Sequence, residues 1–156
     1  MNVGLNDFDD DSTTADPKVI AFYDALDGSG DDGSGETEPY DDQGHGSHCA
    51  GISSGTGSIG DKPVGSGETP YRGVAPGSSL VGVKVLDSGG SGSFSEVMKG
   101  MEWTIDNQQK YNIRAASMSL GGVWLVELTQ EQEERITHLA NEMVAAGISL
   151  MIAAGN

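Results

Sequence analysis

Short apolar runs alternate with amphipathic stretches along most of the chain, and this alternation limits the fold more than any other feature. The runs are six or seven residues long and lie at residues 18–23, 80–86, 115–120 and 148–154. Runs of this length, bounded by turn-forming residues, are typical of buried strands. Stretches with apolar residues at helical spacing lie between them. Strands that alternate with helices indicate parallel pairing through crossover helices, so the sequence predicts the α/β class.

Two capping boxes mark the expected starts of helices. In each box, a hydroxyl and a side-chain oxygen three residues later satisfy each other's free backbone donors: Ser93 with Glu96, and Thr129 with Gln132. Gly147 is placed to end the second helix in a left-handed conformation. The apolar faces that we expect these two helices to bury are Phe94, Val97, Met98, Met101 and Ile105 in the first, and Ile136, Leu139, Ala140, Met143 and Val144 in the second.

Length and charge narrow the class of protein. A chain of 156 residues predicts one domain, residues 1–156, that buries its own core. With 8 basic and 24 acidic residues, its net charge of −16 disfavours nucleic acid and anionic membrane surfaces as partners. No apolar run approaches the roughly 20 residues that span a bilayer, and the polar, acidic start does not resemble a signal peptide. The single cysteine, Cys49, excludes an internal disulfide and a multi-cysteine metal site.

The acidic residues are concentrated near the N-terminus. Residues 1–42 hold 13 acids against one base, and residues 24–42 combine this charge with Gly, Ser and Pro, as solvated loops do. Two interpretations stay open for this acidic loop. It is either a structural calcium site, because hard cations take several carboxylate oxygens, or a loop without metal, because its spacing does not match an EF-hand. Acid excess also suits solubility in high salt.

Residues 42–51 (DQGHGSHCAG) place two histidines and the cysteine on one helical face. A structural histidine is one interpretation. A zinc site of His45, His48 and Cys49 is a second, but it would need carboxylates, since His138 is the only other histidine or cysteine. The third is that His45 is a general base, because an imidazole titrates near neutrality. For Cys49, a small apolar packing role is favoured over a catalytic one.

Glycine-rich segments follow three of the expected strands. Gly90, Ser91 and Gly92 form either a tight turn or a backbone surface on which an extended peptide can pair. Residues 117–122 (SMSLGG) and 153–156 (AAGN) each begin as a buried strand and end in a loop at its carboxyl end. In open α/β sheets, ligands bind at that edge.

These segments, in this order and over essentially the whole chain, resemble the subtilisin-like serine proteases (subtilases). Residues 45–51 (HGSHCAG) are similar to the histidine element of the family, in the cysteine form of its proteinase K branch. Residues 73–86 (GVAPGSSLVGVKVL) are similar to the segment that leads to the substrate-binding edge strand. SMSLGG is similar to the partner strand, and AAGN to the loop of the oxyanion-hole asparagine. Residues 18–23 and the acidic loop resemble prokaryotic, particularly archaeal, members.

The resemblance implies a parallel sheet with helices on both faces, and hydrolysis of peptide bonds by an Asp-His-Ser triad that needs no cofactor. It assigns the general base to His45 and the oxyanion donor to Asn156. It also implies a polypeptide substrate, an extracellular or cell-surface location, and leaves a propeptide open as a second partner. The backbone partners of an extended substrate would be Gly90, Ser91, Gly92, Ser119, Leu120 and Gly121.

Two motifs of the family do not occur in these 156 residues. No Asp-Thr/Ser-Gly precedes His45, and no Gly-Thr-Ser-Met-Ala is present, while Ser47 and Ser119 take the family's helix and substrate-strand positions. We therefore expect a fold that is incomplete at both ends and a chain that is nearly inert by itself, because loss of one triad member removes most of the catalysis. The alternative is a non-catalytic pseudoprotease that binds peptides without cutting them.

Overall fold

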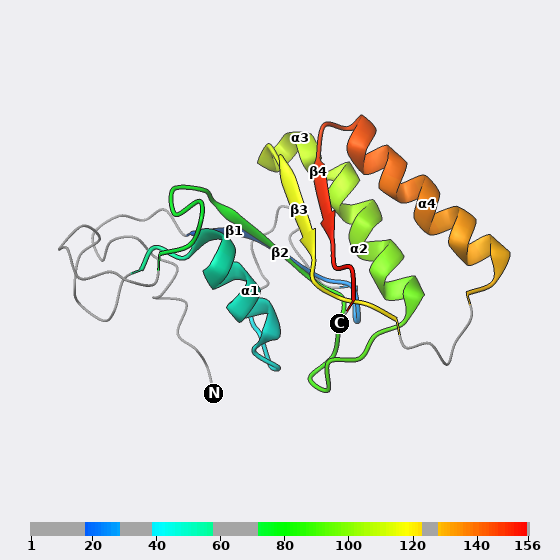
Figure 1. The fold of residues 1–156 in the computed structure, drawn as a ribbon, viewed down its shortest axis with the longest axis horizontal. Helices are drawn as coiled ribbons and strands as arrows, with labels where there is room; N and C mark the ends of the chain where they lie inside the picture. Colours follow the sequence, from blue (N-terminus) through cyan, green and yellow to red (C-terminus); the bar gives the residue numbers. More distant parts are fainter. Residues whose placement is uncertain (1–17, 29–38, 58–71, 123–127, 156) are drawn as a thin grey trace. The chain divides into compact units, whose positions relative to one another are not determined.

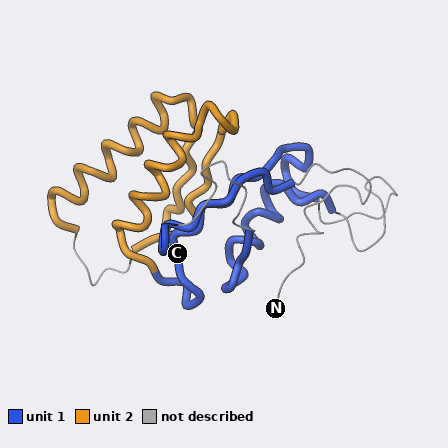
Figure 2. Tube along the Cα trace, turned by 180° about the vertical axis from the view of Figure 1, so that it is seen from behind, with its two compact units in different colours: residues 1–91 blue, residues 92–156 orange. Residues whose placement is uncertain are grey.

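The computed structural model describes residues 18–28, 39–57, 72–122 and 128–155. These residues contain four strands and four helices in the order β1–α1–β2–α2–α3–β3–α4–β4 (Figure 1). They divide into two compact units, residues 1–91 and 92–156 (Figure 2). Each unit holds one parallel pair of strands with helical crossovers, so the predicted α/β class is confirmed.

The first unit is built on β1 (Val19–Asp24) and β2 (Leu80–Lys84), with α1 (His45–Ser54) between them in the chain. The strands run parallel, and Asp24 lies opposite Lys84 at their carboxyl ends. Phe22 is buried in the core of this unit. Gly82 provides the room for its ring, because a Cβ at residue 82 would lie 2.7 Å from Phe22 Cδ2. A larger residue at this position of β2 would therefore displace the ring.

The second unit contains α2 (Phe94–Asp106), α3 (Gln108–Tyr111), β3 (Ala115–Met118), α4 (Gln130–Ala145) and β4 (Ser149–Ile152). β3 and β4 are parallel and in register, from Ala115 opposite Ser149 to Met118 opposite Ile152. α4 packs against both α2 and β4. The buried apolar residues of this unit are Val97, Met101, Ile113, Leu139, Met143 and Ile148.

Both predicted capping boxes are present. The Ser93 hydroxyl accepts from the Glu96 N–H at 3.3 Å, and Thr129 Oγ1 accepts from the Gln132 N–H at 3.3 Å, with the reciprocal bonds in place. Gly147 follows α4 with φ +84°, as expected. These helices begin where the sequence indicates because capping is a local interaction.

Three features of the second unit differ from the sequence prediction. The runs at residues 115–120 and 148–154 are predicted to form buried strands, but every residue of β3 and β4 is exposed or half-buried. Val144, expected in the core, is 61% exposed, because α4 buries only the stripe through Leu139 and Met143. The short helix α3 was not predicted, since four residues carry no apolar periodicity. It ends at Asn112, which has a left-handed conformation with φ 53°.

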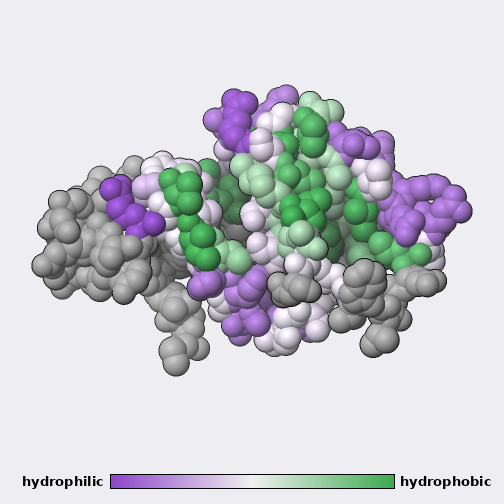
Figure 3. Space-filling model, in the orientation of Figure 1, coloured by the Kyte–Doolittle hydropathy of each residue, from purple (hydrophilic) through white to green (hydrophobic). Residues whose placement is uncertain are grey.

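Within the described ranges, no helix combines the length and apolar character needed to cross a membrane. Apolar side chains do lie open on the second unit, where β4 leaves Met151 49% and Ile152 60% exposed (Figure 3).

Candidate active site

His45 is the first residue of α1, and its side chain is exposed. Its Nε2 lies 3.7 Å from Cys49 Sγ, one helical turn further on, so the expected proximity of these two side chains is confirmed. Cys49 itself is half-buried, and His48 is exposed. Among the residues that the structure describes, no group of three His, Cys, Asp or Glu side chains is arranged to hold a metal ion. The calcium hypothesis for the acidic loop rests largely on residues 29–38, which lie outside the described residues.

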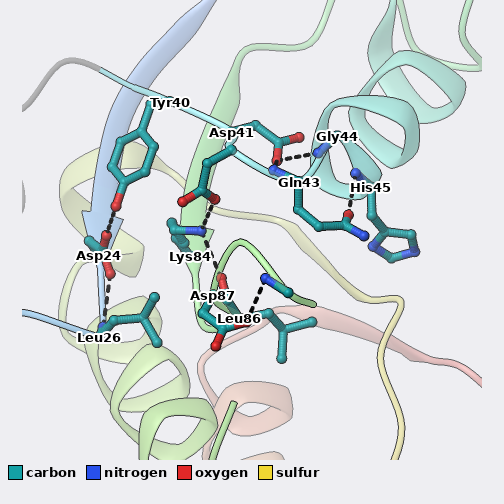
Figure 4. Close-up of polar contacts among 12 residues, drawn as sticks. Asp24, Leu26, Tyr40, Asp41, Gln43, Gly44, His45, Lys84, Leu86 and Asp87 are labelled. Carbon is teal, nitrogen blue, oxygen red and sulfur yellow. Dashed lines mark hydrogen bonds and ion pairs between the residues drawn. The ribbon is translucent and has the colours of Figure 1, made fainter. Parts of the chain in front are cut away.

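The N-terminus of α1 is capped by a side chain that lies before the N-cap position in the chain. Gly44 occupies the N-cap position with φ +97° and has no side chain to satisfy the free N–H groups of the first turn. The Asp41 carboxylate takes this role. Its Oδ1 accepts from Gly44 N at 2.7 Å and from Gln43 N at 3.1 Å (Figure 4). Its Oδ2 accepts from Ser47 N at 2.7 Å. Gln43 Oε1 accepts from His45 N at 2.8 Å. The backbone on both sides of His45 is therefore held by side-chain oxygens.

The charge state of Asp41 follows from these bonds. Partial burial alone raises the pKa of the Asp41 carboxyl, but the N–H groups of Gly44, Ser47 and Gln43, with the Ser47 hydroxyl, outweigh it and lower the pKa to about 2. The carboxylate is therefore ionised over the whole physiological range. A negative charge at a helix N-terminus is also favourable to the helix dipole.

Tyr40, next to Asp41, ties the same segment to β1. Its hydroxyl donates to Asp24 Oδ2, and the other oxygen of Asp24 accepts from Leu26 N at 2.8 Å (Figure 4). Asp24 is only 1% exposed, so these bonds supply the partners that a buried carboxylate requires. The bond to Asp24, together with burial and the charges of Asp24, Asp42 and Asp27, raises the pKa of Tyr40 to about 12. The ring also packs on Phe22 at a centroid distance of 5.5 Å.

Asp42 ties the segment to β2. Its carboxylate lies 2.6 Å from Lys84 Nζ, which also donates to Leu86 O at 2.7 Å. The ammonium lies 5.3 Å from the centroid of the Tyr40 ring. Three consecutive residues, Tyr40–Asp42, therefore connect three parts of the first unit; we call them the anchor segment.

The C-terminus of α1 is held by residues 73–75, the start of the GVAPG segment. The N–H groups of Gly73, Val74 and Ala75 donate to the carbonyls of Gly55, Ile52 and Ser53 at 2.8, 3.1 and 2.8 Å, which satisfies carbonyls that a helix end leaves free. Gly73 allows this close approach, because a Cβ there would lie 2.5 Å from the nitrogen of Gly55.

Residues 87–91, after β2, form a closed turn around Asp87. The Asp87 carboxylate accepts from Gly89 N and Ser91 N at 2.9 Å each, and Asp87 N donates to Ser91 O at 2.7 Å. Gly90 has φ +76° and donates its N–H to Asp87 O. Ser91, one of the expected substrate partners, therefore has both its N–H and its C=O engaged in the turn. Gly92, another expected partner, takes no part in these turn bonds.

In the second unit, two of the expected loops meet at one sheet edge. Ser119, Leu120 and Gly121 follow the carboxyl end of β3, and residues 153–155 follow the carboxyl end of its parallel partner β4. Ala153 N donates to Met118 O at 3.1 Å and so continues the pairing past the strands. Asn156 is the next residue after Gly155 and lies outside the described residues.

The structure thus groups the sequence-derived candidates by unit. His45, Gly90 and Ser91 belong to the first unit, and Gly92, Ser119, Leu120 and Gly121 belong to the second. Asp24, Tyr40 and Asp41 were not singled out from the sequence. For Asp41 a local signal existed, because a helix that starts after a glycine needs its cap from a neighbouring side chain.

Comparison with known proteins identifies the class to which this fold and site belong. The model of the subtilase family matches residues 7–156. Serine protease AprX of Bacillus subtilis is 44% identical over 145 residues, which are 89% of this chain and 29% of that protein. Subtilisin of Bacillus pumilus is 39% identical over 123 residues, 78% of this chain and 37% of that protein. The crystal structure of a cold adapted subtilisin-like serine proteinase is similar with a TM-score of 0.58 and 30% identity, over 86% of this chain and 38% of that one.

These proteins are serine proteases, and the family match includes the histidine element and the two loops that follow β3 and β4. The chain belongs to the subtilase family. It spans about a third of the length of the curated relatives that it matches.

Proposed function

We propose that this chain is part of a serine endopeptidase that hydrolyses peptide bonds through an acyl-enzyme. The observation that carries the proposal is the exposed His45 at the first position of α1, within a subtilase match that extends over residues 7–156. A catalytic imidazole must be reachable by both nucleophile and substrate, and an exposed side chain at a helix start meets that requirement.

In this proposal His45 moves one proton. It accepts the proton of the attacking serine as the serine oxygen bonds to the scissile carbonyl carbon, and it gives that proton to the amine as the C–N bond breaks. Water then attacks the acyl-enzyme with His45 again moving the proton, and the acyl group is released. The serine and the aspartate are assigned to sequence outside these 156 residues, since neither family motif occurs within them. These residues alone are accordingly expected to be inactive.

Asn156 is proposed to donate its side-chain amide to the oxyanion of the tetrahedral intermediate. The arrangement of β3 and β4 supports this, because residues 153–155 lead from the carboxyl end of β4, the edge at which ligands of parallel sheets bind. Ser119, Leu120, Gly121 and Gly92 are proposed to offer backbone groups to an extended substrate. Such pairing uses backbone groups and so accepts many peptide sequences. Gly90 and Ser91 are less suited to this expected role, because the turn around Asp87 already engages the N–H of Gly90 and both backbone groups of Ser91.

The proposal is tested on the full-length protein with casein and a chromogenic peptide. We expect hydrolysis that a serine-directed reagent abolishes and that His45→Ala lowers by about 10³-fold or more. His138→Ala is the matched control, because His138 is exposed and, among the described residues, pairs with Glu142, 3.4 Å away within α4. Equal hydrolysis by the His45→Ala variant would refute the proposal.

The alternative, a pseudoprotease that binds peptides without cutting them, gives a different result in the same assay: peptide binding without hydrolysis. Sequencing the gene on both sides of this segment separates the two independently, since only the protease requires Asp-Thr/Ser-Gly upstream and Gly-Thr-Ser-Met-Ala downstream.

We further propose that the protease acts outside the cell or at its surface. Fractionation of a culture tests this, and activity confined to the cell interior would contradict it.

A further inference from the structure

The anchor segment, Tyr40–Asp42, holds the start of α1, and its three side chains have different partners. Tyr40 bonds to the buried Asp24 at the end of β1, and Asp42 pairs with Lys84 at the end of β2. Only Asp41 turns toward α1 (Figure 4). The effect of each residue on His45 can therefore be separated by substitution.

The imidazole of His45 depends on the backbone for its position. Its side chain is exposed, and the side-chain contact that the structure shows for it is Cys49 Sγ at 3.7 Å. A side chain that is not enclosed by packing takes its location from the φ and ψ angles of the residues that carry it. His45 directly follows Gly44, which has a left-handed φ of +97° and no side chain that would restrict the backbone angles at this turn.

One carboxylate supplies that control. The Asp41 carboxylate accepts hydrogen bonds from three backbone N–H groups, two before His45 and one after it, at 3.1, 2.7 and 2.7 Å. The Gln43 and Gly44 N–H groups fix the approach to the helix, and the Ser47 N–H fixes its first turn. Because both oxygens of one rigid group are used, the two sides of His45 are held in a single geometry. The lowered pKa of Asp41 agrees with these bonds, since they stabilise the ionised carboxyl.

We propose that Asp41 is a positioning residue for His45: it fixes the turn at residues 43–47 so that the imidazole is placed for proton transfer. This rests on the proposed role of His45 as the general base. Asp41 touches neither substrate nor the reacting atoms and acts through the backbone. Misplacement of a catalytic group by about 1 Å can cost about 100-fold in rate, so a loosened turn is expected to lower kcat.

The experiment compares Asp41→Ala, Asp41→Asn and Asp42→Asn in the full-length protein, with kcat normalised to the fraction that shows a native melt. Asp42→Asn is the matched control, because it removes the same charge one residue away, keeps an oxygen for Lys84, and has no bond to α1. We expect Asp41→Ala to lower kcat by about 10- to 100-fold with KM changed less than about threefold. Asp41→Asn, which keeps one acceptor oxygen, is expected to fall between it and the control.

Hydrogen exchange gives a readout that does not depend on activity. Peptides that cover residues 43–47 should exchange faster in Asp41→Ala than in the wild type, whereas peptides from α2 should be unchanged. Activity of Asp41→Ala within twofold of Asp42→Asn, or a loss that appears in KM alone, would overturn the proposal. If Asp41→Ala does not fold, Asp41→Asn decides by the same two criteria. A wild-type protein without hydrolytic activity refutes the proposed function instead, and the exchange measurement still decides whether Asp41 holds the turn.

Discussion

Gly73 is the residue whose substitution most directly tests the structure of the first unit. An alanine Cβ at this position would lie 2.5 Å from Gly55 N and 2.6 Å from Ser54 N, whereas ordinary contacts begin near 3.4 Å. Residues 73–75 would therefore have to move away from α1 by almost 1 Å. The atoms that oppose the Cβ belong to the backbone of the helix end, so rotation of a side chain cannot relieve the contact.

The displacement acts on the three hydrogen bonds that Gly73, Val74 and Ala75 donate to the end of α1, at 2.8, 3.1 and 2.8 Å. A shift of this size stretches them beyond hydrogen-bond length, and each is worth about 1 kcal/mol net. Overpacking of this kind costs a similar total, about 1–3 kcal/mol. We therefore expect Gly73→Ala to lower the free energy of unfolding by about 2–4 kcal/mol, which corresponds to a fall in Tm of about 5–15 °C for a domain of this size.

Thermal melting of the full-length protein, followed by circular dichroism, measures this effect. Gly77→Ala is the control from the same segment, because a Cβ at residue 77 would meet nothing within 4 Å. Its Tm should stay close to that of the wild type, since a substitution in open space changes stability by at most about 0.5 kcal/mol. A Gly73→Ala protein that melts within 2 °C of Gly77→Ala would refute the close approach of residues 73–75 to α1.

Three further predictions concern charge. Tyr40→Phe should destabilise the protein by about 1–3 kcal/mol at neutral pH, because the buried Asp24 loses a hydrogen-bond donor. Since the pKa of Tyr40 is raised to about 12, the wild type should also lose stability between about pH 10 and 12. Tm measured against pH should show that loss in the wild type but not in the variant. The stabilisation from Asp41 should be complete above about pH 4 and disappear as the pH falls through about 2. Because the group is only partly buried and water screens its charge, its contribution is about 1 kcal/mol. An acid titration of Tm that is identical for the wild type and Asp41→Asn would contradict this. Because 13 acids and one base lie in residues 1–42, Tm should rise between 0.1 and 1 M sodium chloride as the Debye length falls from about 10 to 3 Å. A rise with millimolar calcium at fixed ionic strength would show instead that calcium is bound. No shift in Tm in either series would exclude both effects.

The two ends of α1 show how the site is built into the first unit. Asp41 holds the N-terminus, where His45 lies, and residues 73–75 hold the C-terminus. The helix is only ten residues long and contains two glycines, so its own propensity to form is low. Its position is therefore set by these contacts at both ends rather than by intrinsic helix stability, and this is why substitutions outside the helix are expected to act on His45.

The sequence by itself determined the features that depend on neighbours along the chain. The starts of α2 and α4 could be predicted because each capping box, at Ser93 and at Thr129, is complete within four residues. The four strands were indicated by apolar runs, and the family by motifs such as HGSHCAG that are contiguous in sequence. In the same way, Asp41 could have been found from its distance of three residues to the N-cap Gly44, because the bond between them is local.

Only the tertiary structure decided the features that join distant segments. The pairing of Tyr40 with Asp24 spans 16 residues and that of Asp42 with Lys84 spans 42, and no periodicity in the sequence links them. The same holds for Val144, whose exposure depends on which part of α4 meets a neighbour. Gly73 belongs here as well, because the need for a glycine comes from the backbone of a helix end 18 residues earlier. Such contacts depend on the packing of β1, β2 and α1 in the first unit and of α2, α4 and β4 in the second, and a linear pattern contains no distances between segments.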